Sequence, residues 1–100
     1  VSEFKKTLEL NPEHLLAQIG LAVIYKNTGE YDEAEAVLRA ALAKYPNYAE
    51  IRNYLGEVLY KKGVYEEAEA QLKEAVKINK EYAIAYYNLS FVYSAVGNEP

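Results

Sequence analysis

The sequence predicts an all-α fold, a solenoid of helix-turn-helix repeats. Three glycines, Gly29, Gly63 and Gly97, lie 34 residues apart, and a fixed period of about 20 to 50 residues is typical of repeat arrays. Within each unit the apolar residues follow the spacing of an amphipathic helix. The composition agrees, because 51% of the residues are apolar and only five glycines and three prolines interrupt them. We expect about six helices.

Many other positions repeat at the same interval. In the first helix of each unit these are Leu21, Leu55 and Leu89; Ala22, Gly56 and Ser90; and Tyr25, Leu59 and Tyr93. In the second helix they are Ala34 and Ala68, Leu38 and Leu72, and Ala41 and Ala75. The small residues allow neighbouring helices to approach closely, while leucine and tyrosine fill the gaps between them. Stacked helix pairs would then share one continuous core.

The first full helix pair is predicted from its apolar spacing and its end signals. Apolar residues at helical spacing indicate a helix over residues 16–26. Gly29 ends it, because glycine adopts the left-handed backbone conformation at little cost. A second helix is predicted at Tyr31–Lys44, and Pro46 then closes the unit. The helix dipole favours negative charge at a helix start, and the first turns hold Asp32, Glu33 and Glu35.

The second pair repeats this pattern as Ala49–Lys62, Gly63 and Tyr65–Ile78. A lone helix at about residues 2–10 precedes the two pairs, and another at about residues 83–96 follows them. The whole chain, 1–100, is then a single fragment of an array. It divides into the second helix of a partial repeat (1–14), two repeats (15–48 and 49–82) and the first helix of a partial repeat (83–100).

Residues 15–48 and 49–82 resemble the tetratricopeptide repeat family. Its 34-residue unit carries a bulky residue, then Leu-Gly, Tyr, Gly-x-Tyr-x-x-Ala, a large apolar residue, Ala and Pro at set offsets. The matching residues are Gly29-Glu30-Tyr31-Asp32-Glu33-Ala34, Leu38, Ala41 and Pro46, and Tyr54-Leu55-Gly56, Gly63-Val64-Tyr65-Glu66-Glu67-Ala68, Leu72 and Ala75. Gln18 and Arg52 stand at the usual aromatic position, and Lys80 replaces the closing proline. These departures concern local packing and leave the fold unchanged.

The resemblance implies a right-handed superhelix in which the first helix of each pair lines a concave groove. It also implies that the groove binds a peptide or a partner protein. The groove positions carried over are Leu16, Ile19, Val23, Lys26 and Asn27; Glu50, Asn53, Glu57, Tyr60 and Lys61; and Ile84, Tyr87, Asn88, Phe91 and Ala95. This set gives a groove with apolar ends and mixed charge in the middle. For Tyr87 and Phe91 the alternative is a place in the core.

One subgroup of the family does not fit. Its members bind a C-terminal carboxylate of a chaperone with lysine, asparagine and arginine side chains of the groove helices. The corresponding positions here are Ile19 and Val23, then Tyr54, then Ile84 and Asn88. Only Asn88 could contribute, and apolar side chains cannot replace the cationic donors that a carboxylate requires. The sequence therefore excludes this type of clamp for the chain.

The sequence supports neither catalysis nor a cofactor. The lone His14 falls at the repeat position of Tyr48 and Tyr82, which indicates a packing residue at a helix junction rather than a ligand or base. Ser90 occupies the small-residue position. The acidic clusters at 30–35 and 66–69 recur with the repeat and are explained by the helix dipole and solvation. No spacing matches a metal site or a phosphate-binding loop.

Charge and composition limit the classes of partner that the chain is expected to bind. A formal net charge of -4 and a pI near 5.0 disfavour nucleic acid, which normally requires a clustered basic face. No apolar run is long enough to insert into a membrane, and no targeting segment is recognised. The compartment stays open, with the cytoplasm favoured because a chain without cysteines is compatible with a reducing environment.

The two unpaired terminal helices leave a second function open. The simplest account is a piece of a longer array; if the chain is intact, its end faces permit head-to-tail homotypic association. The residues expected at these faces are Leu89, Tyr93 and Val96 at one end and Phe4, Leu8 and Leu10 at the other. The alternative to groove binding is therefore a self-assembling scaffold with an alanine-rich back formed by Ala36, Ala40 and Ala43. A regulatory arm of an enzyme is a minor third alternative.

Overall fold

The structure is a computed structural model that describes residues 15–97. Within this range the chain forms five helices and no strands. Their bounds are α2 (Leu15–Asn27), α3 (Tyr31–Lys44), α4 (Ala49–Lys62), α5 (Tyr65–Ile78) and α6 (Ala83–Val96). The all-α repeat fold expected from the sequence is confirmed. The sixth expected helix, at about residues 2–10, and His14 lie outside the described residues.

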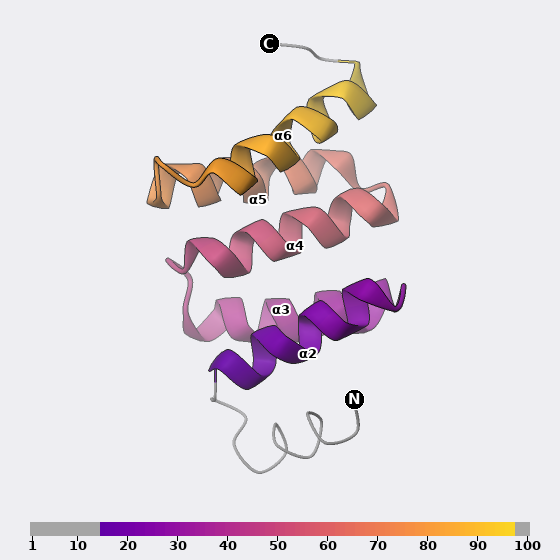
Figure 1. The fold of residues 1–100 in the computed structure, drawn as a ribbon, viewed down its shortest axis with the longest axis vertical. Coiled ribbons are helices and arrows are strands. Elements are labelled where there is room, and N and C mark those ends of the chain that lie inside the picture. Colours follow the sequence, from indigo (N-terminus) through magenta and orange to yellow (C-terminus); the bar gives the residue numbers. More distant parts are fainter. Residues whose placement is uncertain (1–14, 98–100) are drawn as a thin grey trace.

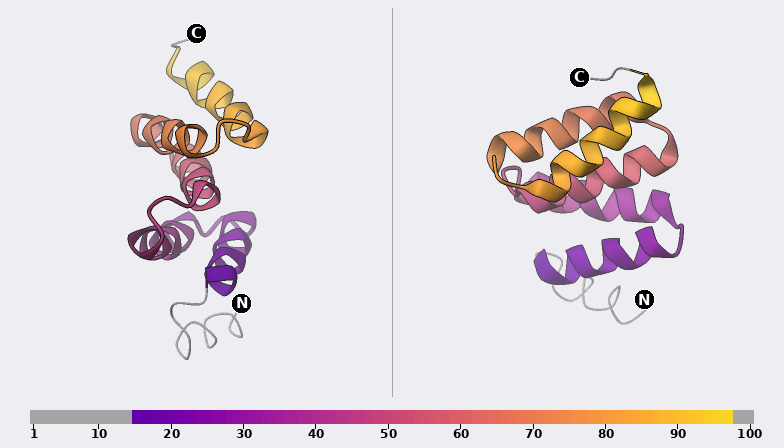
Figure 2. Two further views of the ribbon diagram at one scale, coloured as in Figure 1. Left: turned by 90° about the vertical axis from the view of Figure 1, so that its left-hand side faces the viewer. Right: turned by 45° about the horizontal axis from the view of Figure 1, so that its top comes forward.

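The five helices form two layers of a stack. Figure 1 shows α2, α4 and α6 side by side in front, with α3 and α5 behind them. The view along the helices in Figure 2 shows the same two layers. Each helix packs on the next along the chain, and α4 also contacts both α2 and α6 in the front layer. The face formed by α2, α4 and α6 is therefore one continuous surface built from three first-type helices.

Glycines end the helices as the sequence predicts. Gly63 has φ 84°, and its N–H donates to the carbonyl groups of Leu59 and Tyr60 at the end of α4. Gly29 adopts φ 82° after α2, and Gly97 adopts φ 72° after α6. A side chain in this left-handed region would be strained. The 34-residue period of glycine thus marks the start of each tight turn.

Large and small residues alternate in the core between the two layers. The fully buried large side chains include Leu21, Leu38, Ile51, Leu55, Leu59 and Leu72. Small buried residues face them at Ala34, Ala41, Ala68, Ala75 and Ala85. At Gly56 the helices approach so closely that a Cβ atom would lie 2.5 Å from the Cγ of Leu72. The small-residue positions therefore set the spacing between helices, as the repeat pattern indicates.

Arg52 and Tyr86 stand at the same repeat position and make the same hydrogen bond with different chemistry. Arg52 Nε donates to the carbonyl oxygen of Pro46 at 2.9 Å, and the hydroxyl of Tyr86 donates to that of Lys80 at 3.1 Å. Each bond ties the first turn of a helix to the loop before it. Arg52 also donates to Gln71 Oε1 at 2.9 Å. The arginine thus replaces an aromatic residue without leaving the junction unpaired.

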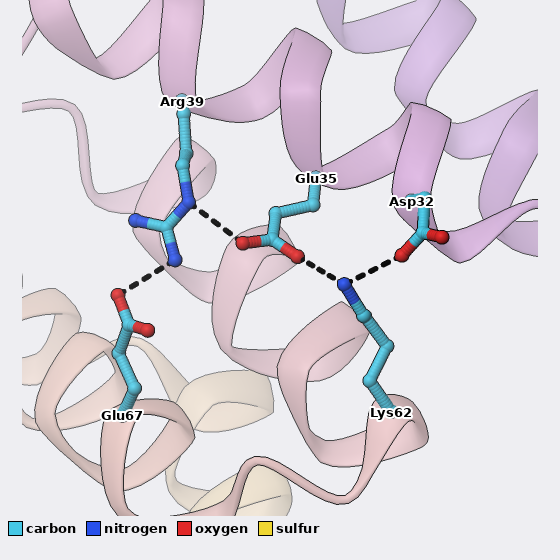
Figure 3. A network of polar contacts seen from close by, with 5 residues as sticks. All are labelled: Asp32, Glu35, Arg39, Lys62 and Glu67. Carbon is cyan, nitrogen blue, oxygen red and sulfur yellow. Dashed lines mark hydrogen bonds and ion pairs between the residues drawn. The ribbon is translucent and has the colours of Figure 1, made fainter.

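A polar network connects three helices on one side of the stack. Figure 3 shows Lys62, at the end of α4, between Asp32 and Glu35 of α3. Arg39 joins Glu35, at 2.8 Å, to Glu67 of α5, at 2.7 Å. The sequence explains these carboxylates by helix dipoles and solvation alone. The structure adds ion pairs between successive repeats, which the 34-residue pattern by itself does not reveal.

Candidate protein-binding groove

The expected groove positions lie on α2, α4 and α6 but differ in accessibility. The exposed residues are Leu16, Asn27, Lys61, Ile84, Tyr87, Phe91 and Ala95. The half-buried residues are Val23, Lys26, Glu50, Glu57, Tyr60 and Asn88. Ile19 and Asn53 are buried, at 8% and 2% exposure, and belong to the floor of this face. The surface a partner could touch is thus richest in exposed apolar side chains at α6.

Six of the expected residues line one pocket of about 280 Å³ between α4 and α6. These residues are Glu57, Tyr60 and Lys61 from α4 and Tyr87, Asn88 and Phe91 from α6. The two helices lie side by side in the front layer, so residues separated by about one repeat in sequence meet here. The structure brings these six together, while Leu16 and Ile84 lie elsewhere on the same face and do not line this pocket.

Three aromatic rings form most of the apolar wall of the pocket. Phe91 lies edge-on to Tyr87, with ring centroids 4.8 Å apart and an interplanar angle of 81°. Phe91 also contacts Tyr60 across the gap between helices, at 6.2 Å. Edge-to-face pairs at such distances are favourable. Tyr87 and Phe91 nevertheless stay 63% and 42% exposed, so the alternative place in the core is wrong for both.

The two charged side chains that line the pocket, Glu57 and Lys61, differ in their ion pairing. Lys26 Nζ donates to Glu57 Oε2 at 3.0 Å and lies 5.6 Å from the centre of the Tyr54 ring. Glu57 is thus neutralised by a cation from the neighbouring repeat. Lys61 is exposed and has no ion pair within residues 15–97. The ammonium group of Lys61 is therefore the uncompensated charge of the pocket.

An amide pair fixes the floor beside the pocket. Asn88 Nδ2 donates to Asn53 Oδ1 at 3.0 Å, which satisfies a side chain that is almost completely buried. The neighbouring Tyr82 has its pKa raised to about 12, chiefly by burial and then by the negative charge of Glu50, while a hydrogen bond with Asn53 acts in the opposite direction. Tyr82 is a groove neighbour that the sequence prediction missed, although its repeat position, shared with Tyr48, could have indicated it.

A family model for the tetratricopeptide repeat matches residues 1–53 and 29–90. These two matches together cover most of the chain. The chain belongs to the tetratricopeptide repeat family.

Two curated relatives carry this repeat segment within much longer proteins. One is a probable UDP-N-acetylglucosamine–peptide N-acetylglucosaminyltransferase SPINDLY of Hordeum vulgare, 30% identical over 98 residues, which covers 91% of this chain and 10% of the relative. The other is the protein O-mannosyl-transferase TMTC3 of Homo sapiens, 31% identical over 99 residues, which covers 96% of this chain and 11% of the relative. The chain therefore spans about a tenth of each enzyme.

Solved structures of similar fold include MamA. One crystal structure of MamA superposes with a TM-score of 0.89 at 27% identity, covering 95% of this chain and 56% of that chain. A second, MamA AMB-1, gives a TM-score of 0.83 at 22% identity, with 95% and 56% covered, and shows the likeness of fold alone. Both matches place this chain in a helical repeat architecture of the tetratricopeptide type.

The far face of α6 differs from the equivalent face of the two complete tetratricopeptide repeats. Ser90 is exposed, whereas Ala22 and Gly56 at the same position are buried. Within residues 15–97 no second-type helix packs on this face. Leu89, expected in the exposed end face, is instead 6% exposed and packs in the core. Tyr93, also expected there, is half-buried and packs against the core, whereas Val96 is exposed in the last turn of α6. Tyr86 and Ser90, one helical turn apart, are exposed on the end face, and Phe4, Leu8 and Leu10 of the opposite face lie outside the described residues.

Other kinds of site find no support in the described part of the chain. Residues 15–97 contain no group of three histidine, aspartate or glutamate side chains that could hold a metal ion. None of the helices α2 to α6 is long and apolar enough to cross a membrane. The tetratricopeptide fold and its structural neighbours support a protein–protein interaction module.

Proposed function

We propose that this chain binds a peptide or partner-protein segment on the face of α2, α4 and α6, with the pocket between α4 and α6 as its centre. The observation that supports this most is the exposed aromatic pair Tyr87–Phe91 beside Tyr60. Exposed tyrosine and phenylalanine side chains in a hollow bury a large area with few rotatable bonds, which is typical of energetic anchors in protein interfaces.

The remaining expected groove residues have graded roles in this proposal. Leu16 and Ile84 extend the contact surface toward the two ends of the face. Lys26, Asn27 and Glu50 form its polar middle. Ile19 and Asn53 support the floor without contacting a partner directly, because they are buried, and the half-buried Val23 adds apolar surface beside them. The domain division into a partial repeat, two repeats and a further partial repeat is part of the same proposal.

The proposal describes a binding module without catalysis or cofactor. The two curated relatives are glycosyltransferases by name, but the chain spans about a tenth of them. A role as a regulatory or substrate-holding arm of a longer enzyme is compatible with the same groove. In either case the groove, and not a reacting group, would carry the function of these residues. The carboxylate clamp for chaperone tails stays outside the proposal.

The test is selection of binders from a random-peptide display library on the immobilised protein. Selected peptides are labelled, and their binding to Tyr87→Ala, Phe91→Ala and Tyr86→Ala is measured by fluorescence anisotropy. Tyr86 lies on the same helix at 48% exposure but does not line the pocket, so its variant is the matched control. We expect each groove variant to weaken binding by at least tenfold, about 1.4 kcal/mol, and the control to leave it unchanged. Equal binding to all variants with retained helical circular dichroism would reject the proposal.

A scaffold that assembles with itself is a second candidate. It is favoured by the exposed end face of α6 and by Ala36, Ala40 and Ala43, which are all exposed on α3. Sedimentation over a wide concentration range tests it. The double substitution Ala36→Glu and Ala40→Glu should prevent self-association through the alanine-rich surface of α3 and leave peptide binding intact. A monomer at all concentrations would exclude the scaffold and leave the groove proposal standing.

A further inference from the structure

The nature of the bound segment follows from the charges around the pocket. Resting on the proposed groove function, we propose that the pocket takes one bulky apolar side chain, such as phenylalanine or leucine, from an acidic segment. An aspartate or glutamate side chain within that segment would pair with Lys61. Four observations support this assignment.

The size of the pocket fits one side chain. Its volume of about 280 Å³ lies just below the range of roughly 300–1,000 Å³ typical of pockets that enclose a whole small molecule. The rings of Tyr60, Tyr87 and Phe91 form the apolar part of its wall. Such a wall suits an aromatic or branched aliphatic side chain, which offers apolar area and fits between rings.

The charges at the rim favour an acidic neighbour over a basic one. An aromatic pocket next to a carboxylate would ordinarily suggest a cation as ligand. Here the carboxylate of Glu57 already accepts a hydrogen bond from Lys26 at 3.0 Å, so its charge is compensated within the chain and attracts a further cation less strongly. Lys61 lines the same pocket and forms no ion pair in the described chain. The local balance is therefore one positive charge.

The net charge of the whole chain does not outweigh this local balance. The protein carries a formal charge of -4, but charges beyond about 8–10 Å are largely screened at physiological salt. The carboxylates of the network in Figure 3 belong to α3 and to the start of α5, whereas the end of α4 contributes the cation Lys62. They are also partly neutralised by Lys62 and Arg39. A carboxylate at Lys61 would thus meet mainly the nearby ammonium group.

Asn88 adds a directional contact on the same rim. One N–H of its amide group is donated to Asn53, and an amide carries two such donors. The second N–H and the side-chain carbonyl remain for the main chain of a bound segment. In this arrangement Asn88 would orient the bound segment and the aromatic rings would hold its apolar side chain. Lys61 would favour segments that carry a negative charge.

The experiment uses random-peptide display selection on the wild-type protein. Selected peptides are synthesised with amidated C-termini, so that any carboxylate must come from a side chain. Binding is then measured on Lys61→Gln, Lys61→Glu and Lys77→Gln at low and high salt. Lys77 is exposed on α5, in the other layer, so its substitution changes net charge by the same amount as Lys61→Gln without altering the pocket.

The inference expects selected peptides that carry an aromatic or leucine residue close to aspartate or glutamate. Lys61→Gln should weaken the binding of these peptides by about fivefold, which is the effect of an ion pair at a partly exposed site. High salt should remove this difference between wild type and variant. Lys61→Glu should favour peptides in which lysine replaces the acidic residue, and Lys77→Gln should change nothing.

The outcomes separate this inference from the proposed function. Peptides that lose binding on Tyr87→Ala but are basic, or are indifferent to Lys61→Gln, would overturn the acidic-segment assignment and leave the groove in place. Peptides that need a free C-terminal carboxylate would overturn it in the same way. If no selected peptide depends on Tyr87 or Phe91, the groove proposal fails, and this assignment fails with it.

Discussion

At Gly56, α4 comes so close to α5 that a single methyl group would collide with its neighbour. A Cβ atom there would lie 2.5 Å from Leu72 Cγ and 3.2 Å from the carbonyl oxygen of Ala68. Gly63, by contrast, has no atom within 4 Å of such a Cβ, and its requirement is the backbone angle φ of 84°. The two glycines therefore serve different purposes, contact in one case and conformation in the other.

We expect Gly56→Ala to lower the free energy of unfolding by up to about 2 kcal/mol. Overpacking a core costs about 1–3 kcal/mol, and the better helix propensity of alanine returns about 1 kcal/mol. Urea unfolding monitored by circular dichroism measures the difference. The matched background is Leu72→Ala, which removes the colliding side chain, so the cost of Gly56→Ala should largely disappear there. An equal cost in both backgrounds would contradict the collision.

Tyr82 provides a prediction about alkaline pH. Its pKa is raised to about 12 by burial and by Glu50, compared with about 10 in the unfolded chain. Because the folded state holds the proton more tightly, this group's contribution to stability should be lost as pH rises from about 10 to about 12. The difference in phenolate absorbance between wild type and Tyr82→Phe during a pH titration measures the pKa directly. Glu50→Gln should lower it, and a value near 10 in wild type would contradict the assigned environment.

At the scale of the elements, the polar network is a second connection between repeats beside the apolar core. Lys62 of α4 and Arg39 of α3 both donate hydrogen bonds to Glu35, and these bonds hold the pKa of Glu35 below its usual value. Hydrogen bonds to Glu67 and then Glu35 raise the pKa of Arg39, and hydrogen bonds to Asp32 and then Glu35 raise the pKa of Lys62. Since the groups are mostly exposed, the network should fine-tune stability rather than determine it.

The lowered pKa of Glu35 predicts how the stability of the protein changes at acid pH. A carboxyl group with a lowered pKa contributes stability that is present above its unfolded pKa near 4.5 and is lost as pH falls through the lower folded pKa. Glu35→Gln should therefore reduce the urea concentration at the unfolding midpoint at neutral pH. It should also make this midpoint less sensitive to a fall in pH. Glu74→Gln, an exposed carboxylate of α5, is the control and should have little effect. Parallel pH profiles for Glu35→Gln and wild type would contradict the network's role.

The sequence predicts the helices well because their signals are local. Gly63 and Gly97 end their helices through backbone conformation. The acidic first turns of α3 and α5 and the apolar spacing also lie within one helix. The pocket depends on more distant relations. Asn53 is buried because Asn88 of the next repeat pairs with it, and Glu57 is neutralised by Lys26 of the preceding one. Repeat position alone could not separate these residues from exposed groove positions.

Repeat position describes Arg52 and Leu89 only in part. Arg52 departs from the family's aromatic residue, yet it donates to the same loop carbonyl as Tyr86. Leu89 matches the core leucines of the complete repeats and is buried like them, so it could not also form the end face. Position in the repeat predicts which neighbour a residue meets, while the chemistry of that neighbour decides what the residue does.

For the whole molecule, the repeat architecture implies that stability adds up from neighbouring units. The exposed face of α6 carries Tyr86 and Ser90, and within residues 15–97 it lacks the second-type helix that covers Ala22 and Gly56. A copy of residues 64–80 joined after Gly97 would place its counterparts of Ala68 and Leu72 against Ser90. We expect this extension to raise the free energy of unfolding by about 1–2 kcal/mol, given roughly 0.05–0.15 kcal/mol per residue in folded domains.

The control for this extension is the same copy with its counterparts of Ala68 and Leu72 changed to aspartate, which cannot be buried on α6. Urea unfolding should show a higher midpoint and a larger dependence on denaturant for the apolar copy alone. Sedimentation of both proteins then distinguishes the two functions. If only the apolar copy abolishes self-association, the contact forms through the end face of α6, and the groove remains free for its partner. If both extended proteins still associate, assembly occurs through another surface, and the scaffold with its alanine-rich back on α3 becomes the better account.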